Sequence, residues 1–101
     1  MSVTFVRSGQ MMPGKFREAQ EFVQKRRQWI ADTYGIAPAI MTQLGGPVGR
    51  IAMVTETESV AKIEEVRRQL IEGALPAELA AGPEGLFIPG QTMDRIWLKI
   101  S

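Results

Sequence analysis

Two arginines lie on the apolar faces of predicted helices. Arg26 falls within the apolar arc of a helix predicted over residues 15–34, and Arg67 falls within that of a helix predicted over residues 59–72. Surface helices usually place their charges on the opposite face. A guanidinium presents planar, bidentate donors that suit a carboxylate or a carbonyl oxygen. These positions are therefore candidates for substrate binding.

Two interpretations of these arginines stay open. In the first, their methylene groups lie along the sheet while the charged ends reach solvent, or pair with Glu64 and Asp94. In the second, they hold an anionic or carbonyl-bearing ligand in a cavity between helices and sheet. The second predicts that Arg26→Ala weakens ligand binding more than it lowers the melting temperature.

Asp94 is the only acid near the last predicted strand, residues 93–100. Burial would raise its pKa and make it a general base, able to remove a proton from an activated carbon or a phenol. Arg95 beside it is the second catalytic candidate. The alternative is an exposed carboxylate that pairs with Arg95 or Arg50.

Further candidates for substrate binding are two aromatic residues of the first helix and two residues of the strands. Trp29 and Tyr34 either stack on an aromatic ligand or belong to the core. Arg50 lies on the third predicted strand, and Trp97 lies on the last.

Composition restricts the chemistry. The chain has no cysteine and no histidine, which removes thiolate metal sites, the usual haem ligand and the Ser-His triad. We therefore expect no metal and no cofactor. The net charge of +1 and a third strand without aromatic residues argue against binding of nucleic acid. There is no apolar run long enough for a membrane span and no signal-peptide pattern, so we expect a cytoplasmic protein without membrane association.

Periodicity and turn residues predict a single domain over residues 1–101 with the order βαββαβ. This is the α+β ferredoxin-like arrangement, a four-stranded antiparallel sheet with two helices on one face. The expected strands are 2–8, 36–44, 48–55 and 93–100; the expected helices are 15–34 and 59–72, and a helical turn at 76–79 lies in a loop over 74–90. The hairpin strands do not alternate between apolar and polar residues, so the second sheet face must also be covered. A second copy of the chain fits that need.

Short motifs at the element boundaries resemble a known family. They are Pro13-Gly14-Lys15, Gly46-Pro47-Val48-Gly49-Arg50-Ile51, Ser59-Val60-Ala61 and Arg67-Arg68. The pattern resembles the NIPSNAP-like branch of the dimeric α/β-barrel superfamily. The resemblance implies a homodimer whose sheets pack face to face, with a cavity between sheet and helices in each subunit. Relatives include haem enzymes, and also cofactor-free monooxygenases that act on polycyclic phenols. Because this chain has no histidine to bind haem, its similarity to the haem-binding branches does not imply haem binding here.

Two functions stay open. The first is a small enzyme acting on an apolar, carbonyl- or phenol-bearing metabolite without metal or haem, as a cofactor-independent monooxygenase, isomerase or cyclase. The apolar loop over 74–90 would then be its lid. The second is a non-catalytic dimeric module that binds a small molecule or another protein, which the lack of a convincing acid-base pair favours. The sequence does not decide whether the chain is an enzyme.

Overall fold

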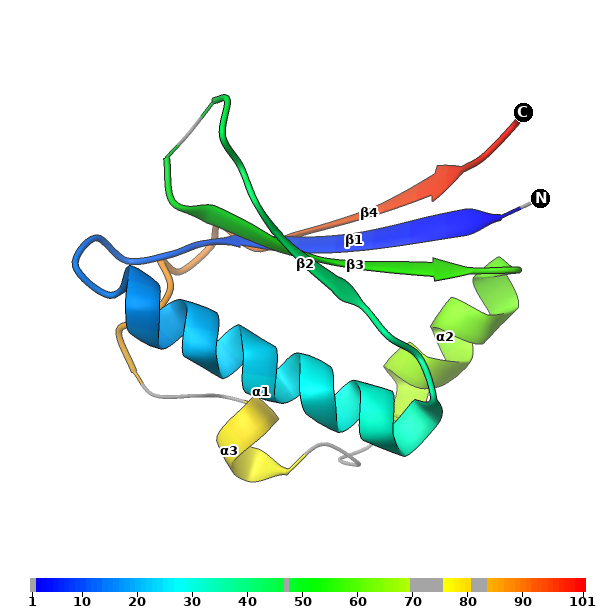
Figure 1. The fold of residues 1–101 in the computed structure, drawn as a ribbon, viewed down its shortest axis with the longest axis horizontal. Coiled ribbons are helices and arrows are strands. Elements are labelled where there is room, and N and C mark those ends of the chain that lie inside the picture. Colours follow the sequence, from blue (N-terminus) through cyan, green and yellow to red (C-terminus); the bar gives the residue numbers. More distant parts are fainter. Residues whose placement is uncertain (1, 47, 70–75, 81–83) are drawn as a thin grey trace.

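The computed structural model describes residues 2–46, 48–69, 76–80 and 84–101. The strands pair in the order β2-β3-β1-β4, all antiparallel, and Figure 1 shows the helices on one side of this sheet. The predicted ferredoxin-like α+β fold is confirmed. In chain order the elements are β1 (Val3–Gln10), α1 (Phe16–Tyr34), β2 (Ala39–Thr42), β3 (Arg50–Thr57), α2 (Val60–Gln69), α3 (Ala77–Ala80) and β4 (Met93–Leu98).

Helix α1 begins one residue after the predicted start at Lys15 and ends at the predicted Tyr34. It ends at Gly35, whose φ of 68° is left-handed and whose backbone N–H donates to the carbonyl of Ala31 at 3.0 Å. Such a terminus favours glycine, because other residues pay a steric cost at positive φ. Ala19 and Ile30 are buried on the face toward the sheet. The helix therefore presents one fixed face, which carries Arg26, to the space beneath the strands.

Helix α2 begins directly after Ser59. The Ser59 hydroxyl accepts a 3.4 Å hydrogen bond from the backbone N–H of Lys62, the interaction that an N-terminal cap supplies. Ile63 is buried against the sheet. The predicted end of this helix, near residue 72, lies outside the described residues, as does part of the 74–90 loop.

Strand β2 is shorter than the predicted strand over 36–44, since it covers only Ala39–Thr42. Pro38 precedes it and has no backbone N–H to donate to a neighbouring strand. At the other end Gln43 donates to the carbonyl of Arg50 at 3.1 Å, and the chain then leaves the ladder for the hairpin turn. The prediction of a strand over the whole apolar run 36–44 is therefore wrong at both ends.

The core lies between α1 and the sheet. Its most buried side chains come from both layers and from the segment before β4: Met11, Ala19, Ile51 and Leu86. Leu86 belongs to a short strap, residues 86–88, that hydrogen-bonds to the end of β1. Met12 donates to the Leu86 carbonyl at 2.8 Å, and Ile88 donates to the Gln10 carbonyl at 2.9 Å. The strap thus closes one end of the space between helix and sheet.

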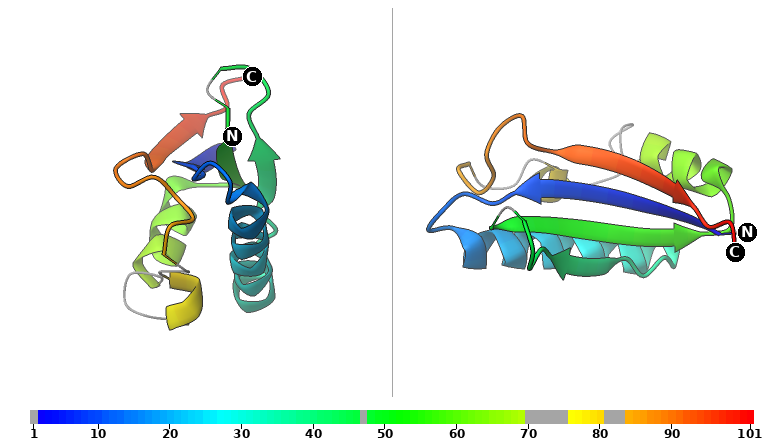
Figure 2. Two further views of the ribbon diagram at one scale, coloured as in Figure 1. Left: turned by 90° about the vertical axis from the view of Figure 1, so that its left-hand side faces the viewer. Right: turned by 90° about the horizontal axis from the view of Figure 1, so that it is seen from above.

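Among the described residues, no helix lies on the opposite face of the sheet (Figure 2). Figure 2 shows α1 and α2 on the same side of the strands and no described helix on the other side. Residues paired directly across antiparallel strands share a face, so the pair Thr4↔Trp97 places Trp97 on the helix-free face. Ser8 pairs with Met93 on β4 and with Ala52 on β3, and Ala52 pairs with Met41 on β2, so Met93 and Met41 lie on this face as well. This face carries large apolar side chains in the open.

Candidate functional site

A cavity of about 500 Å³ lies between the sheet and the two long helices. Its volume falls in the range of roughly 300–1,000 Å³ that small-molecule sites occupy. Most of its wall is apolar, from both helices and from β1 and β3. The apolar and aromatic side chains that line it are Phe5, Phe22, Val23, Ile30, Ile36, Ile51, Met53, Ile63, Val66 and Phe87.

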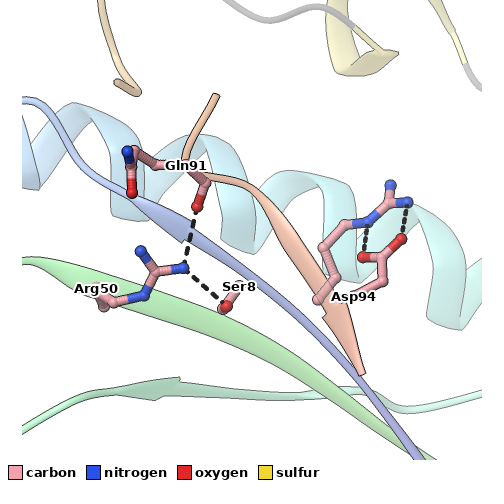
Figure 3. A network of polar contacts seen from close by, with 5 residues as sticks. Ser8, Arg50, Gln91 and Asp94 are labelled. Carbon is pink, nitrogen blue, oxygen red and sulfur yellow. Dashed lines mark hydrogen bonds and ion pairs between the residues drawn. The ribbon is translucent and has the colours of Figure 1, made fainter. Parts of the chain in front are cut away.

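An arginine on strand β1 joins the wall of this cavity. Arg7 donates from Nε and Nη2 to the two carboxylate oxygens of Asp94 on β4, each at 2.8 Å. The two residues pair directly across the strands, so the register aligns them for a bidentate contact. These hydrogen bonds from Arg7 hold the pKa of Asp94 below its usual range, against the opposing effect of burial. Figure 3 shows Asp94 with both oxygens engaged.

This geometry corrects the prediction for Asp94. The sequence suggested either a general base of raised pKa or a carboxylate paired with Arg95 or Arg50. The structure pairs it with Arg7 instead, and the pKa shift has the opposite sign. An acceptor whose two oxygens are both occupied and whose ionised form is stabilised is a poor proton acceptor near neutral pH. Asp94 therefore neutralises Arg7 in this arrangement.

The structure places both arginines of the predicted helices at the cavity wall. Arg26 is half-buried, and its loss of hydration lowers its pKa, with the positive charge of Arg7 adding to the effect. Arg67 also lines the cavity but remains exposed, so it lies where the cavity opens to solvent. Among the described residues, neither has a hydrogen-bonding or ion-pair partner, including the predicted partners Glu64 and Asp94.

The charges around the cavity do not balance. Three guanidiniums line it, those of Arg7, Arg26 and Arg67, and none of the described residues in its wall is acidic. Asp94 pairs with Arg7, and the guanidiniums of Arg26 and Arg67 form no ion pair with any of the described residues. Burying an unpaired charge is unfavourable, so an anion or a strong hydrogen-bond acceptor in the cavity would stabilise the half-buried guanidinium of Arg26.

Three other predicted site residues lie away from the cavity. Strand register puts Arg50, Arg95 and Trp97 on the helix-free face. Arg50 donates from Nη2 to the hydroxyl of Ser8 at 2.9 Å and to the carbonyl of Gln91 at 3.0 Å, where it ties β1 to the start of β4. Figure 3 shows this group apart from Asp94. The structure does not bring these residues together with Arg26 and Arg67.

Trp29 and Tyr34 also lie outside the cavity wall. Their rings pack edge to face with centroids 5.8 Å apart, near the end of α1. The Tyr34 hydroxyl is buried and finds no hydrogen-bond partner among the described residues. Stacking of either ring on a ligand in the cavity would need both rings to move.

Residues 86–88 of the proposed lid pack against the core and the cavity wall. Phe87 packs edge to face on Phe22 at a centroid distance of 6.2 Å, and Leu86 is buried in the core. With the hydrogen bonds to β1 these contacts make the strap part of the cavity wall. The remainder of the 74–90 loop includes residues outside the described ranges.

Arg7 is the site residue that sequence reasoning missed. Strand alternation puts it on the same face as Val3 and Phe5, so a charge on an apolar strand face was readable at this position. Helical periodicity identifies inward charges on helices only, so it gives no information about a strand residue such as Arg7. The partner of Arg7 was not readable, because the register that aligns it with Asp94 joins residues 87 positions apart.

The described residues contain neither a cluster of metal ligands nor a membrane-spanning helix. Among the described residues, no three acidic, histidine or cysteine side chains gather closely enough to hold a metal ion. Within the same part of the chain, no helix is long and apolar enough to cross a membrane.

Comparison with solved structures identifies the fold. A NIPSNAP family protein from Agrobacterium tumefaciens superposes with a TM-score of 0.72 at 20% identity, over 99% of this chain and 94% of that one. The chain has a NIPSNAP-like ferredoxin fold. A NIPSNAP-like domain protein from Burkholderia xenovorans gives a TM-score of 0.72 at 17% identity, over 99% of this chain and 86% of that one. No family sequence model and no curated protein sequence matches the chain.

One similar structure has a stated activity. A variant of SnoaB, a cofactor-independent oxygenase from Streptomyces nogalater, superposes with a TM-score of 0.69 at 13% identity, over 99% of this chain and 94% of that one. Identity at this level establishes a common fold and leaves the chemistry to the residues of each site.

Proposed function

We propose that the protein binds an apolar small metabolite bearing a carbonyl or phenol group in the cavity between sheet and helices. The observation that carries the proposal is a cavity of about 500 Å³ whose largely apolar wall also contains three guanidiniums. Apolar pockets with a few placed polar groups are the usual form of small-molecule sites. The apolar wall would bind the body of the ligand, and Arg26 and Arg67 would orient its oxygen.

In the enzymatic form of this proposal, the cavity transforms the metabolite without metal or haem, as an oxygenase, isomerase or cyclase. Fixed positive charges favour the ionised form of a phenol or enol, which lowers the pKa of the bound substrate. Water can then take the proton, so that no protein carboxylate is needed as base. The fold shared with the cofactor-independent oxygenase SnoaB supports this form by analogy.

The second candidate function is binding without turnover, and one observation favours it. Asp94 is engaged by Arg7, and none of the described residues of the cavity wall is another acid. General acid-base catalysis needs a side chain that can exchange a proton within reach of the substrate. A site without one binds ligands more readily than it transforms them.

The assembly we propose is a homodimer formed through the helix-free face. Trp97 is 61% exposed and Met41 is 54% exposed on this face, although both are large apolar side chains. A second copy of the same face would cover them, which also fits the small size of the core. Trp97→Glu should then give a monomer in size-exclusion chromatography with light scattering, whereas Leu44→Glu at the exposed hairpin tip should stay dimeric. A wild-type monomer would refute this assembly.

A panel of apolar phenols, ketones and quinones, screened by thermal shift, tests the function. A compound that raises the melting temperature identifies a ligand class, because a ligand that binds only the folded state stabilises it. Oxygen uptake and product analysis with that compound then separate the two candidates. Turnover supports the enzyme, and stable binding without turnover supports the binding module. If no compound in the panel binds, the proposed function is wrong.

A further inference from the structure

We infer that the ligand of this cavity carries a carboxylate, held by Arg26 from one side and by Arg67 from the other. This inference rests on the proposed function and narrows it, since a carbonyl or phenol ligand need not be charged. The apolar remainder of the molecule lies against the wall formed by β1, β3 and the strap. The ligand class is thus an organic acid with one apolar body and one carboxylate end.

The two arginines come from different helices that lie on the same face of the sheet. Arg26 projects from α1 and Arg67 from α2, and both line the one cavity. Each also acts electrostatically on Asp94, so all these groups share one local field. A planar anion between the helices would receive donors from two directions, which suits the two oxygens of a carboxylate.

Arg7 explains why the protein itself does not satisfy this site. Among the described residues, Asp94 is the acid on which the charges of Arg26 and Arg67 act, and it is held on Arg7 by two 2.8 Å hydrogen bonds. Both of its oxygens are therefore committed at the edge of the cavity. Arg26 is half-buried with no hydrogen-bond or ion-pair partner among the described residues, and the negative charge of Asp94 offsets its desolvation only in part, so its pKa is lowered. An incoming carboxylate would supply the missing counter-charge.

The wall favours a carboxylate over a phosphate. Phosphate sites usually collect several backbone N–H groups at a helix N-terminus or in a glycine-rich loop. Here the polar groups of the described wall are the guanidiniums and hydroxyls such as those of Thr55 and Thr57, while most of the lining is apolar. A carboxylate of single charge costs less to desolvate in such surroundings than a dianion.

Matched pairs of probes test the inference by isothermal titration at neutral pH. Each pair has the same apolar body and differs only in charge: benzoate with benzamide, 2-naphthoate with 2-naphthamide, and octanoate with octanamide. Phenyl phosphate is the fourth arm. We expect at least one carboxylate to bind about tenfold or more tightly than its amide, as expected for hydrogen bonds to a charged group.

Variants locate the effect. Arg26→Gln and Arg67→Gln should each reduce the preference for carboxylate over amide by about tenfold, while amide binding changes little. Arg17→Gln is the matched control on α1, since the Arg17 side chain is 89% exposed. Arg68→Gln is the control on α2, where that side chain is also exposed. Both controls should keep the wild-type preference.

Each outcome has a distinct meaning. Equal binding of carboxylate and amide overturns the carboxylate inference but leaves a small-molecule site in place. Tighter binding of phenyl phosphate than of benzoate also overturns it. A carboxylate preference that survives both Arg26→Gln and Arg67→Gln shows that other groups bind the anion, which is a third refutation. Failure of every probe, charged or neutral, overturns the proposed function along with the inference.

Discussion

Replacing Asp94 by asparagine removes the charge that neutralises Arg7 while keeping the shape of the side chain. The variant leaves the Arg7 guanidinium at the cavity wall beside an amide, which offers one acceptor oxygen in place of the two oxygens of a carboxylate. We expect the folded state to lose stability, because a bidentate contact between opposite charges becomes a hydrogen bond from the guanidinium to one uncharged oxygen.

The size of this loss follows from the exposure of the pair. The side chains of Arg7 and Asp94 are 40% and 28% exposed, so solvent screens their attraction substantially. Exposed ion pairs contribute roughly 0.2–1 kcal/mol, and the bidentate geometry places this one at the upper end, at about 1 kcal/mol. For a domain of this size, about 1 kcal/mol corresponds to a fall of roughly 4–8 °C in melting temperature.

The pH dependence of the effect has a defined sign. The pKa of Asp94 in the folded state lies below its ordinary value of 3.8, because Arg7 stabilises the ionised form. The ionised carboxylate therefore contributes stability at pH values above that ordinary value, and the contribution is lost as the pH falls through the lower, folded-state pKa. The difference between wild type and Asp94→Asn should be full at pH 7 and should shrink below about pH 4.

Urea unfolding at pH 7, 5, 4 and 3.5 measures this difference, at equal protein concentration for both proteins. The double variant with Arg7→Gln supplies the coupling energy between the two side chains, expected at about 1 kcal/mol. Equal stability of wild type and Asp94→Asn at pH 7 would refute the reasoning. So would a difference that stays constant down to pH 3.5, because the contribution would then not come from the ionised carboxylate.

Three further variants test other parts of the structure. Arg26→Met should leave the melting temperature unchanged or raise it, because the variant removes a desolvated charge and keeps the apolar part of the side chain. Carboxylate binding should fall about tenfold. A clear loss of stability with unchanged binding would show that Arg26 has a structural role. Gly49→Ala should lower the free energy of unfolding in urea by about 2 kcal/mol or more, since Gly49 has a φ of 90° and a Cβ would lie 2.6 Å from the Phe16 ring. Gly85→Ala is the control, because Gly85 has a φ of 79° but open space around it, and should cost only about 1 kcal/mol. Equal costs for the two variants would contradict the packing at Gly49. Leu86→Ala should lower the free energy of unfolding by about 2–4 kcal/mol, as expected for a buried core residue. A change near zero would indicate that the strap is a mobile lid instead of part of the core.

Most of the fold could be predicted because its signals are local. The 3.6-residue period of α1, the glycine at its end and the serine before α2 each depend on a few neighbouring residues. Their chain order then leaves few topologies open, and the ferredoxin-like sheet follows. Strand ends were less certain, as β2 shows, since apolar character continues past the last ladder hydrogen bond.

The site was only half predictable for a related physical reason. Helical periodicity located Arg26 and Arg67 correctly on the cavity side, because it needs only the sequence of each helix. The partner of Asp94 depends on which residues of two distant strands stand opposite each other, and this register is a property of the whole sheet. The same register assigns Arg50 and Trp97 to the helix-free face, which their positions in the sequence could not reveal.

The most direct measurement is a two-dimensional ¹⁵N–¹H NMR titration of the labelled protein with 2-naphthoate. If the cavity is the binding site, the largest shifts will fall on amides of its wall, among them Phe5, Thr55 and Ile63. Shifts confined to the helix-free face, around Met41 and Trp97, would contradict binding in the cavity. An unchanged spectrum at saturating concentrations of this probe and of 2-naphthamide would contradict the existence of the site.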